Sequence, residues 1–171
     1  FVFVEMARRL GKCRFVFFTW QIRALSELLR RRLEASFSAA GLNFSDYGVF
    51  VPWQSTPGFY GLMKRADVFL DTIGFSGFNT AIQAVECNLP VVAKDGRFMR
   101  GRLASGILRR MGMHELIAET TEDYVRLAVR LAQEPGYRQQ IRDRMKTAQH
   151  VLFDDVSSVH ALEKMLVGLA R

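Results

Sequence analysis

Five short apolar runs alternate with helix-periodic stretches along the chain, and this alternation constrains the fold more than any other feature. Strands that alternate with helices predict an α/β fold, here a doubly wound, Rossmann-like parallel sheet. The third run is expected to be covered on both faces, as strands of parallel sheets are. Gly11 and Gly41 are predicted to end the first two helices. The expected strands are Cys13–Phe18, Tyr47–Pro52, Ala66–Thr72, Pro90–Lys94 and Glu115–Ala118.

The C-terminal third of the chain is expected to be helical. Thr121 leads one helix, with Glu122 and Asp123 in its favourable first turn. A second helix follows the Pro135-Gly136 break, and Asp155 is expected to open the last one. We therefore expect one domain over 1–171, a fragment of a longer protein, that ends in a C-terminal helix over 154–171.

Composition is that of an ordinary globular protein. The 171 residues are 49% hydrophobic and 24% charged, which disfavours disorder. No apolar run approaches the roughly 20 residues of a membrane span. The stretch that begins at Phe1 lacks the basic leader and cleavage site of a signal peptide. The length suits one domain or one half of a larger enzyme.

Charge, cysteines and histidines exclude several classes of site. Cys13 and Cys87 show no CxxC spacing, which favours two buried thiols in a reducing compartment and a cytoplasmic location. The three histidines lack metal-ligand spacing. The net charge of +7 comes from arginines spread around helices, such as Arg109 and Arg110, which we interpret as solvated. No nucleic-acid signature interleaves them with aromatic residues, and a diffuse positive field also suits a small anion.

Loop-like residues follow three of the predicted strands. In doubly wound sheets, ligands bind beyond the carboxyl ends of the strands, so these loops predict a pocket. The loop after the third strand contains Gly77, Asn79 and Thr80 before a helix. Its backbone N–H groups could bind phosphate, with both side chains donating to it. The alternative is an ordinary helix cap.

Further candidates flank this turn, and each has a structural alternative. Gln83 and Glu86 could face a ribose or could lie on a solvated helix face. Lys94 ends a buried strand and begins a short basic segment that also contains Arg97, Arg100 and Arg102. These basic residues could bind a ligand or could serve solubility alone. Trp53 and Phe59 could stack on a base or belong to the core.

Residues from about Phe50 to Met145 resemble the C-terminal catalytic half of the O-linked N-acetylglucosamine transferases. They resemble equally three other groups. These are the bacterial relatives with tetratricopeptide repeats, the SPINDLY-type proteins and the adhesin N-glucosyltransferases. The matching features run without a gap: Ala66-Asp67-Val68, Leu70-Asp71-Thr72, Gly77, Thr80, Pro90, Gly96, Arg102, Gly112, Glu115–Ala118, Tyr124, Ala128-Val129 and Leu131. As a set these features are specific, although each alone is weak.

The resemblance implies a GT-B architecture, a nucleotide-sugar donor and a protein or peptide acceptor. It implies neither metal nor cofactor, no nucleic-acid partner, and a catalytic base in the N-terminal half. If the family's donor-binding residues are carried over to this sequence, the backbone at Trp53-Gln54 contacts uracil. Phe59 stands at the position where a family histidine packs on the base. Asn79 and Thr80 hold the diphosphate. Phe78 replaces a histidine of the O-linked branch, whereas Asn79 matches the N-glucosyltransferases.

Gln83 is the main departure from the family. It stands where the family has an acidic residue that binds both ribose hydroxyls, and an amide makes weaker bonds than a carboxylate. Glu86 could take over this role. We therefore expect the donor-binding half of an inverting glycosyltransferase that uses a UDP-sugar, and we expect the fragment alone to be inactive. The alternative is a non-catalytic module that kept the fold and binds nucleotide sugars or protein partners.

Overall fold

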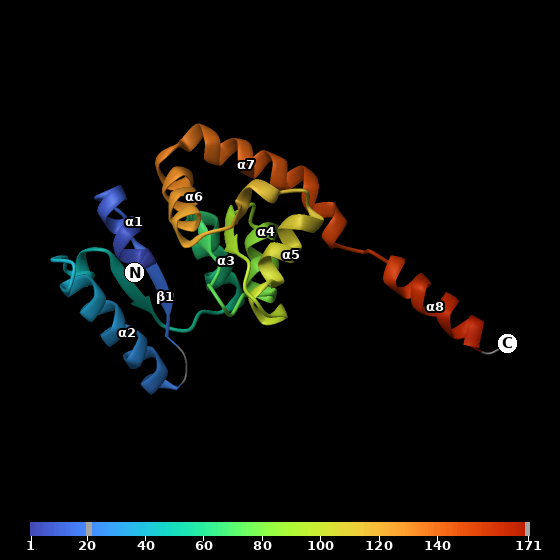
Figure 1. Cartoon of the computed structure of the whole chain (residues 1–171), viewed down its shortest axis with the longest axis horizontal. Coiled ribbons are helices and arrows are strands. Elements are labelled where there is room, and N and C mark those ends of the chain that lie inside the picture. The colour runs from blue at the N-terminus through green and yellow to red at the C-terminus, as the bar shows by residue number, and fades with distance from the viewer. Residues whose placement is uncertain (20–21, 170–171) are drawn as a thin grey trace.

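The computed structural model describes residues 1–19 and 22–169 and has an α/β architecture (Figure 1). Its first half contains α1 (Val2–Leu10), β1 (Phe15–Phe18), α2 (Arg23–Ser38), the 3-10 turn η1 (Phe44–Asp46), β2 (Gly48–Val51), α3 (Thr56–Arg65) and β3 (Phe69–Leu70). Its second half contains α4 (Asn79–Glu86), β4 (Val91–Lys94), η2 (Met99–Gly101), α5 (Leu103–Arg110), η3 (His114–Leu116), β5 (Ile117–Ala118), α6 (Thr121–Gln133), α7 (Pro135–Ala148), η4 (Gln149–Leu152) and α8 (Ser157–Leu169). The predicted alternation of strands and helices is confirmed.

All the strand pairs in the described residues are parallel, as predicted. β1 pairs with β2, with Phe15 opposite Gly48. The other three strands form a sheet in the order β3–β4–β5, with Phe69 opposite Val91. The hydrogen bonds thus divide the strands between two sheets that lie beside one another, with β1 on the side toward the second sheet (Figure 1).

The third strand is shorter and more exposed than its sequence indicates. Ala66–Thr72 was expected to be one strand covered on both faces, but only Phe69 and Leu70 are assigned to β3, and both are half-buried. The neighbouring β4 residues Val91 and Val92 are fully buried. The physical reason is position in the sheet, because among residues 1–19 and 22–169 β4 has a strand on each side whereas β3 has one only.

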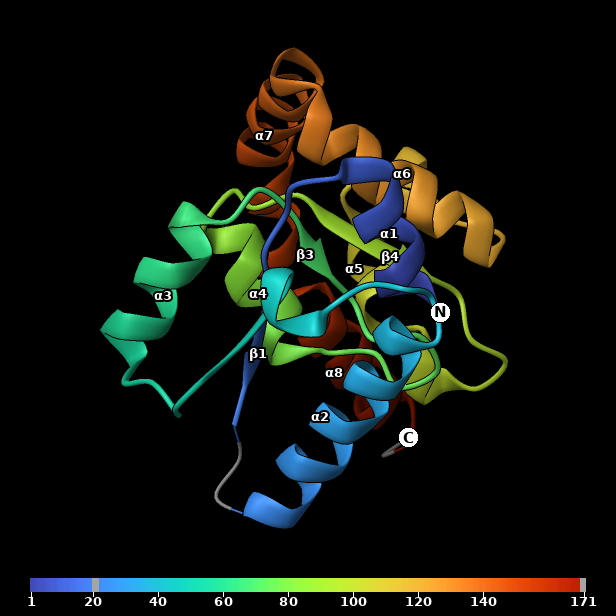
Figure 2. The ribbon, with the colours of Figure 1, turned by 90° about the vertical axis from the view of Figure 1, so that its left-hand side faces the viewer.

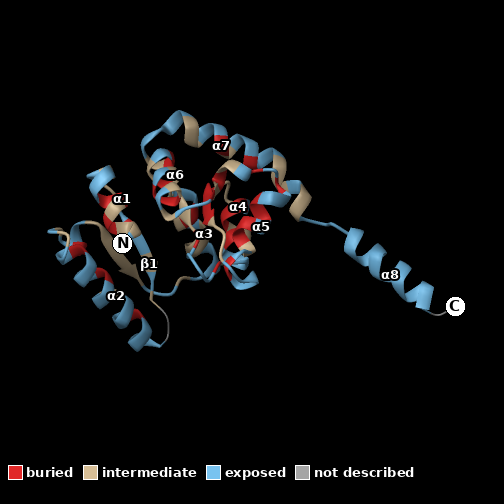
Figure 3. Cartoon of the chain, in the orientation of Figure 1, coloured by how far each residue is buried: buried red, intermediate tan, exposed pale blue. Residues whose placement is uncertain are grey.

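The core lies between the second sheet and the helices α4, α5 and α6, where most buried residues gather (Figure 3). Two views show α3 on one side of this sheet and α1 with α6 on the other (Figures 1 and 2). α1 is joined to α6 by an ion pair between Arg9 and Glu122, 2.7 Å from Nη1 to Oε1. Gln133 Nε2 also donates to the Arg9 carbonyl at 3.2 Å. These contacts hold the two sheets beside each other.

Glycines and caps set most helix ends as expected. Gly11 and Gly41 both have positive φ, 67° and 74°, which a glycine adopts without strain. α6 begins at Thr121, as predicted. Thr120 caps the helix, because its Oγ1 accepts from Asp123 N–H at 3.0 Å while the Asp123 carboxylate accepts from Thr120 N–H.

α8 extends away from the rest of the molecule, and all of its described residues are exposed (Figures 1 and 3). Asp155 Oδ1 accepts from Ser157 N–H at 3.0 Å, so it caps this helix as predicted. The same carboxylate pairs with Arg110 at 2.7 Å, and Arg110 is exposed, as the sequence indicated. Within the described residues, no helix combines the length and the apolar character that crossing a membrane requires.

Candidate functional site

The loop between β3 and α4 is organised by one buried carboxylate. Asp71 ends the strand region and is 2% exposed. Its Oδ2 accepts from the Ser76 hydroxyl at 2.7 Å, and its Oδ1 accepts from Gly77 N–H at 2.8 Å. A side chain on the strand thereby fixes the loop that leads into α4.

Ser76 extends this network to a second helix. It is 3% exposed, and its Oγ accepts from Ala104 N–H in the first turn of α5 at 2.8 Å. Its own N–H donates to the Arg100 carbonyl at 2.7 Å. The Tyr124 hydroxyl, from α6, donates to the Asp71 carbonyl at 2.7 Å. The loop is therefore tied to α5, α6 and the loop after β4 by buried polar groups.

Burial perturbs both ionisable groups of this network. Desolvation raises the pKa of Asp71, although the bonds from Ser76 and Gly77 act in the opposite direction because they favour the carboxylate. Desolvation, together with the Asp71 charge, also raises the pKa of Tyr124 well above its usual range. Neither Asp71 nor Ser76 was among the predicted site residues. The sequence feature that could have indicated a role for Asp71 was its position at the carboxyl end of a strand, next to the small-residue turn.

α4 begins without a side-chain cap. Phe78 is its N-cap residue, and neither Asn79 nor Thr80 caps it. The first hydrogen bond of the helix runs from Ile82 N–H to the Phe78 carbonyl at 3.0 Å, so the preceding N–H groups have no partner within the helix. Asn79 and Thr80 are both exposed. The helix-cap alternative therefore receives no support here, and the turn keeps the features of an anion-binding helix start.

Close packing against a side chain and against backbone explains two glycines of the site. A Cβ at Gly77 would stand 2.4 Å from Thr80 Oγ1, so a side chain there would displace the threonine hydroxyl. A Cβ at Gly96 would stand 3.0 Å from the Gly101 Cα, and Gly96 N–H donates to the Gly101 carbonyl at 2.8 Å. Gly101 in turn lies against the Gly74 backbone. The two loops therefore touch backbone to backbone.

The loop after β4 is held at its base by one ion pair and a side-chain hydrogen bond. Asp95 pairs with Arg109 and accepts from the Ser105 hydroxyl, both on α5. The hydrogen bond from Arg109 lowers the pKa of Asp95. Arg109 is exposed, as the sequence indicated, and the ion pair is an additional surface contact. Arg102 Nε donates to the Gly96 carbonyl at 2.8 Å, so this predicted ligand residue also shapes its own loop.

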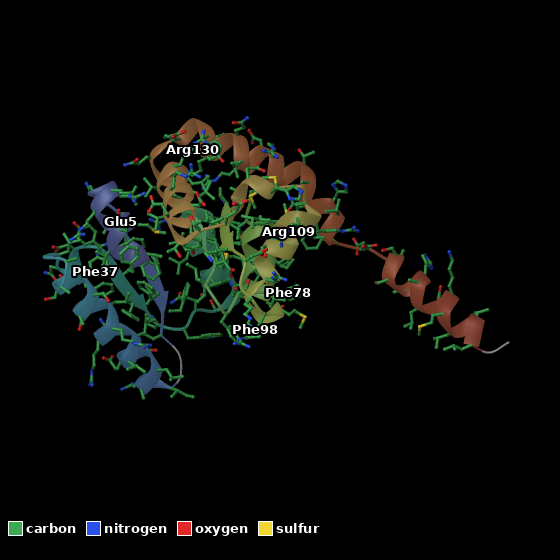
Figure 4. All side chains as sticks on the ribbon, viewed as in Figure 1. Glu5, Phe37, Phe78, Phe98, Arg109 and Arg130 are labelled. Atoms are coloured by element: carbon green, nitrogen blue, oxygen red, sulfur yellow. The ribbon has the colours of Figure 1, made fainter. Side chains whose placement is uncertain are left out.

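The remaining cations of this loop surround Phe98. The guanidinium carbons of Arg97 and Arg100 lie 5.5 and 4.7 Å from its ring centroid. Lys94 is half-buried at the end of β4 and forms no salt bridge within the described part of the chain. Phe98 and Phe78 lie at the same end of the molecule (Figure 4). The structure thus gathers Gly77, Phe78, Asn79 and Thr80 with Lys94 and Arg102 at the carboxyl ends of two adjacent strands.

Gln83 and Glu86 both interact with Tyr60, a residue of α3 that the sequence reasoning missed. The Tyr60 hydroxyl donates to Glu86 Oε2, and this bond is the main reason that the pKa of Tyr60 is raised. A side-chain hydrogen bond with Gln83 acts in the opposite direction. The three residues form a polar contact between α3 and α4 instead of two independent solvated side chains. No sequence pattern links a tyrosine with a glutamate 26 positions away.

The predicted base-binding residues lie after β2 and at the start of α3. Trp53 is 62% exposed, and Gln54 folds onto its own loop, with Nε2 donating to the Pro52 carbonyl at 2.7 Å. Phe59 is half-buried against Phe18, with ring centroids 5.2 Å apart. Phe59 thus belongs partly to the core, which was the structural alternative, whereas Trp53 lies on the surface.

No group of three or more His, Cys, Asp or Glu side chains able to hold a metal ion occurs among residues 1–19 and 22–169. A hollow of about 420 Å³ lies between the end of α5 and α7, lined by residues that include Met111, Met113 and Asp143. None of the predicted site residues lines it. This hollow is therefore separate from the candidate site.

Comparison with known proteins identifies the family. The profile of glycosyl transferase family 41 matches residues 60–162, which is more than half of the chain. This chain belongs to glycosyl transferase family 41. The match contains α4, the Asp71 network and both loops of the candidate site, but it leaves out Trp53, Gln54 and Phe59.

Similar proteins of this family are much longer than the chain. A UDP-N-acetylglucosamine–peptide N-acetylglucosaminyltransferase of Caenorhabditis elegans is 31% identical over 105 residues, 60% of this chain and 9% of that protein. A UDP-glucose:protein N-beta-glucosyltransferase of Actinobacillus pleuropneumoniae is 32% identical over 82 residues, 47% of this chain and 13% of that protein. The K341M mutant of the Thermobaculum terrenum O-GlcNAc transferase superimposes with a TM-score of 0.81 at 24% identity. The superimposed region covers 96% of this chain and 32% of the Thermobaculum terrenum chain. This likeness confirms the family 41 fold.

Proposed function

We propose that this chain is the donor-binding half of a GT-B glycosyltransferase that transfers a sugar from a UDP-sugar to protein side chains with inversion. The observation that carries the proposal is the uncapped start of α4, held by the buried Asp71–Ser76 network at the carboxyl end of a parallel strand. The chain belongs to family 41, and the names of both relatives above specify a UDP-sugar and a polypeptide acceptor. The names of the two relatives specify different sugars. We therefore propose a UDP-sugar as the donor and do not assign the sugar.

The start of α4 suits a diphosphate leaving group. Gly77 lets the phosphates approach the backbone, and the N–H groups at Asn79 and Thr80 point along the positive end of the helix dipole. In an inverting transfer, the acceptor oxygen or nitrogen attacks the anomeric carbon from the side opposite the diphosphate. The carbon–oxygen bond breaks, and its electron pair leaves with the β-phosphate oxygen. The helix start stabilises that developing charge, with Lys94 adding positive charge at the same edge.

The other parts of the substrates are assigned by their chemistry. The exposed Trp53 and the backbone beside Gln54 are proposed to contact uracil, and Gln83 is proposed to accept from a ribose hydroxyl. The acceptor protein and the base that takes its proton are assigned to a second half of the cleft, outside this chain. The transfer is proposed to need no metal ion or cofactor.

The proposal is tested by titrating UDP and uridine against four proteins: the wild type, Asn79→Ala, Thr80→Ala and Thr120→Ala. UDP at ten times its dissociation constant should raise the free energy of unfolding by roughly 1.4 kcal/mol. Asn79→Ala and Thr80→Ala should each weaken UDP by about 1.5–3 kcal/mol, since they lose a hydrogen bond to a charged group, and should leave uridine unchanged.

Thr120→Ala is the matched control, because Thr120 is an established helix cap in the same domain. It should lower stability by about 1 kcal/mol and leave the affinity for UDP unchanged. If Asn79→Ala and Thr80→Ala behave like this control, their role is in folding and the phosphate assignment is wrong. If millimolar UDP leaves the thermal midpoint of the folded wild type unchanged, nucleotide binding itself is wrong.

A second candidate function, a non-catalytic module, is favoured by one observation. Gln83 replaces the expected acidic residue, and the carboxylate nearby, that of Glu86, already accepts from Tyr60. Gln83→Asp should tighten UDP by about 1 kcal/mol if this position faces ribose, and by less for 2′-deoxy-UDP. If neither Gln83→Asp nor Glu86→Gln changes the ratio of the two affinities, the ribose lies elsewhere and the module is the better description.

A further inference from the structure

Five large apolar side chains are exposed on the two loops of the candidate site. They are Ile73, Phe75 and Phe78 on the loop after β3, and Phe98 and Met99 on the loop after β4. Two of them, Phe78 and Phe98, are seen at the same end of the molecule in Figure 4. Single exposed apolar residues are ordinary, whereas several that gather on one surface indicate an interaction site.

The backbone brings the two loops together at this surface. Ser76 N–H donates to the Arg100 carbonyl at 2.7 Å. The residues that directly precede this bonded pair are the two most exposed of the apolar group, Phe75 at 70% and Met99 at 81%. The loops also touch at Gly101, which lies against the backbone of the loop after β3. The apolar side chains of both loops therefore belong to one surface.

Two exposed arginines border these side chains. The guanidinium carbons of Arg97 and Arg100 lie 5.5 and 4.7 Å from the ring centroid of Phe98. Neither arginine forms a salt bridge with a residue that the structure describes, although arginines of α5, α6 and α7 do. Stacking uses the face of a guanidinium and leaves the N–H groups in its plane for a carboxylate. We call the five apolar side chains and these two arginines the loop surface.

The positive charge of the loop surface is not neutralised within the two loops, all of whose residues the structure describes. Asp95 is the one acidic residue in 94–102, and its carboxylate pairs with Arg109. Residues 72–80 contain no charged side chain. Phe, Met and Arg are also the residues that are enriched at the centres of protein interfaces. The complementary partner is a polypeptide with carboxylates beside an apolar side chain.

The loop surface borders the proposed phosphate site. Phe78 is the N-cap residue of α4 and directly precedes Asn79. An extended polypeptide advances about 3.3 Å per residue, so a side chain that reaches the transfer site has its neighbours within a short distance of that site. Exposed apolar and basic side chains also suit an anionic membrane surface. The position beside the site of transfer to protein side chains favours the polypeptide.

We propose that the loop surface binds the acceptor polypeptide and selects segments in which carboxylates lie beside an apolar side chain, close to the residue that is modified. This inference rests on the proposed function, which makes the bound polypeptide an acceptor. Arg97 and Arg100 bind the carboxylates, while Phe98 and Met99 contact the apolar side chain. The base and the other acceptor contacts remain assigned to the second half of the cleft.

The test titrates two short labelled peptides against the chain and follows their fluorescence anisotropy. One peptide contains a Ser flanked by Asp, Glu and Phe, and the other replaces Asp and Glu by Asn and Gln. No nucleotide is added, so the result does not depend on the proposed UDP site. The variants are Arg97→Gln/Arg100→Gln and Phe98→Ala. The matched control, Arg31→Gln/Arg32→Gln, removes the same charge from exposed arginines of α2.

The wild type should bind the acidic peptide at least about tenfold more tightly than the amide peptide, because carboxylates make charge-assisted bonds with arginine. Arg97→Gln/Arg100→Gln should abolish this preference, and Phe98→Ala should weaken both peptides by about fivefold or more. The control should keep the preference within about twofold. Equal affinities of the wild type for the two peptides, or no binding of either at millimolar concentration, would overturn the proposal. An equal loss of preference in the control would also overturn it, since a diffuse field would then explain the binding.

Sedimentation with vesicles separates the polypeptide from a membrane surface. Phosphatidylcholine vesicles that contain about 30% phosphatidylserine should leave the wild type in solution. Sedimentation with these vesicles that Arg97→Gln/Arg100→Gln removes would overturn the acceptor assignment in favour of a membrane. If UDP fails to stabilise the chain while the peptide preference persists, the proposed function alone is wrong. If UDP binds and the preference is absent, this inference alone is wrong.

Discussion

The loop after β3 and the segment after β2 both follow the carboxyl ends of parallel strands, but their side chains differ in burial. The first is fixed by the buried groups of Asp71 and Ser76, which bond to two loops and a neighbouring helix start. The second presents Trp53 at 62% exposure. The proposed phosphate side is therefore tied to neighbouring elements by buried polar groups, whereas the proposed base side presents an exposed indole ring.

This comparison makes Asp71→Ala the most damaging substitution in the site. It removes the acceptor of two hydrogen bonds and leaves buried donors without a partner, so we expect a loss of about 3 kcal/mol in the free energy of unfolding. Urea denaturation measures it. Asp67→Ala is the matched control, because Asp67 is exposed and contributes only a 3.3 Å ion pair with Arg138. It should cost less than about 1 kcal/mol. Equal losses would show that the buried network does not distinguish this loop.

Gly96→Ala should have the next largest effect. Its Cβ would stand 3.0 Å from the Gly101 Cα, and backbone cannot move aside as a flexible side chain can. We expect a loss of about 1–2 kcal/mol. Gly106→Ala on α5 is the control, since a Cβ there meets nothing within 4 Å. It should stabilise the helix by up to about 1 kcal/mol. A neutral Gly96→Ala, measured by thermal unfolding, would mean that the two loops separate readily.

Stability should depend on pH through Asp71 in a defined direction. Burial raises the pKa of Asp71 in the folded state, so between its unfolded and folded pKa values the folded protein binds more protons. The free energy of unfolding should therefore fall as pH rises through that window. Asp71→Asn cannot titrate, and the stability of the wild type relative to this variant should fall over the same window. Denaturation from about pH 4 to about pH 7 measures it, and a difference that grows with pH would show that the hydrogen bonds outweigh desolvation.

Trp53→Ala should have the smallest effect on stability, at most about 0.5 kcal/mol, because the side chain is largely exposed. It should weaken UDP and uridine by the same factor, since stacking concerns the base alone. Isothermal titration of both ligands measures this. A greater loss for UDP than for uridine would place Trp53 at the phosphates and would remove the division of the site into two flanks.

The sequence by itself determined the local elements, because periodicity, glycine positions and capping residues act within a few residues. α6 begins at Thr121 as predicted, and Gly11 and Gly41 end their helices. The small-residue turn before Asn79 was also recognisable, since a glycine two residues before a helix start indicates a tight backbone turn. These features depend on neighbours along the chain, so they are visible before folding.

Only the tertiary structure decided which distant groups meet. Asp71 bonds to Tyr124, 53 positions away, Ser76 bonds to Ala104, 28 positions away, and Tyr60 bonds to Glu86 across two helices. The separation of the strands into two sheets is of the same kind, because the apolar run around Phe69 looks the same whether or not a strand lies beside it. Such contacts depend on how the sheet brings remote segments to one edge, and the desolvation that raises the pKa of Asp71 exists only once those segments have packed around it.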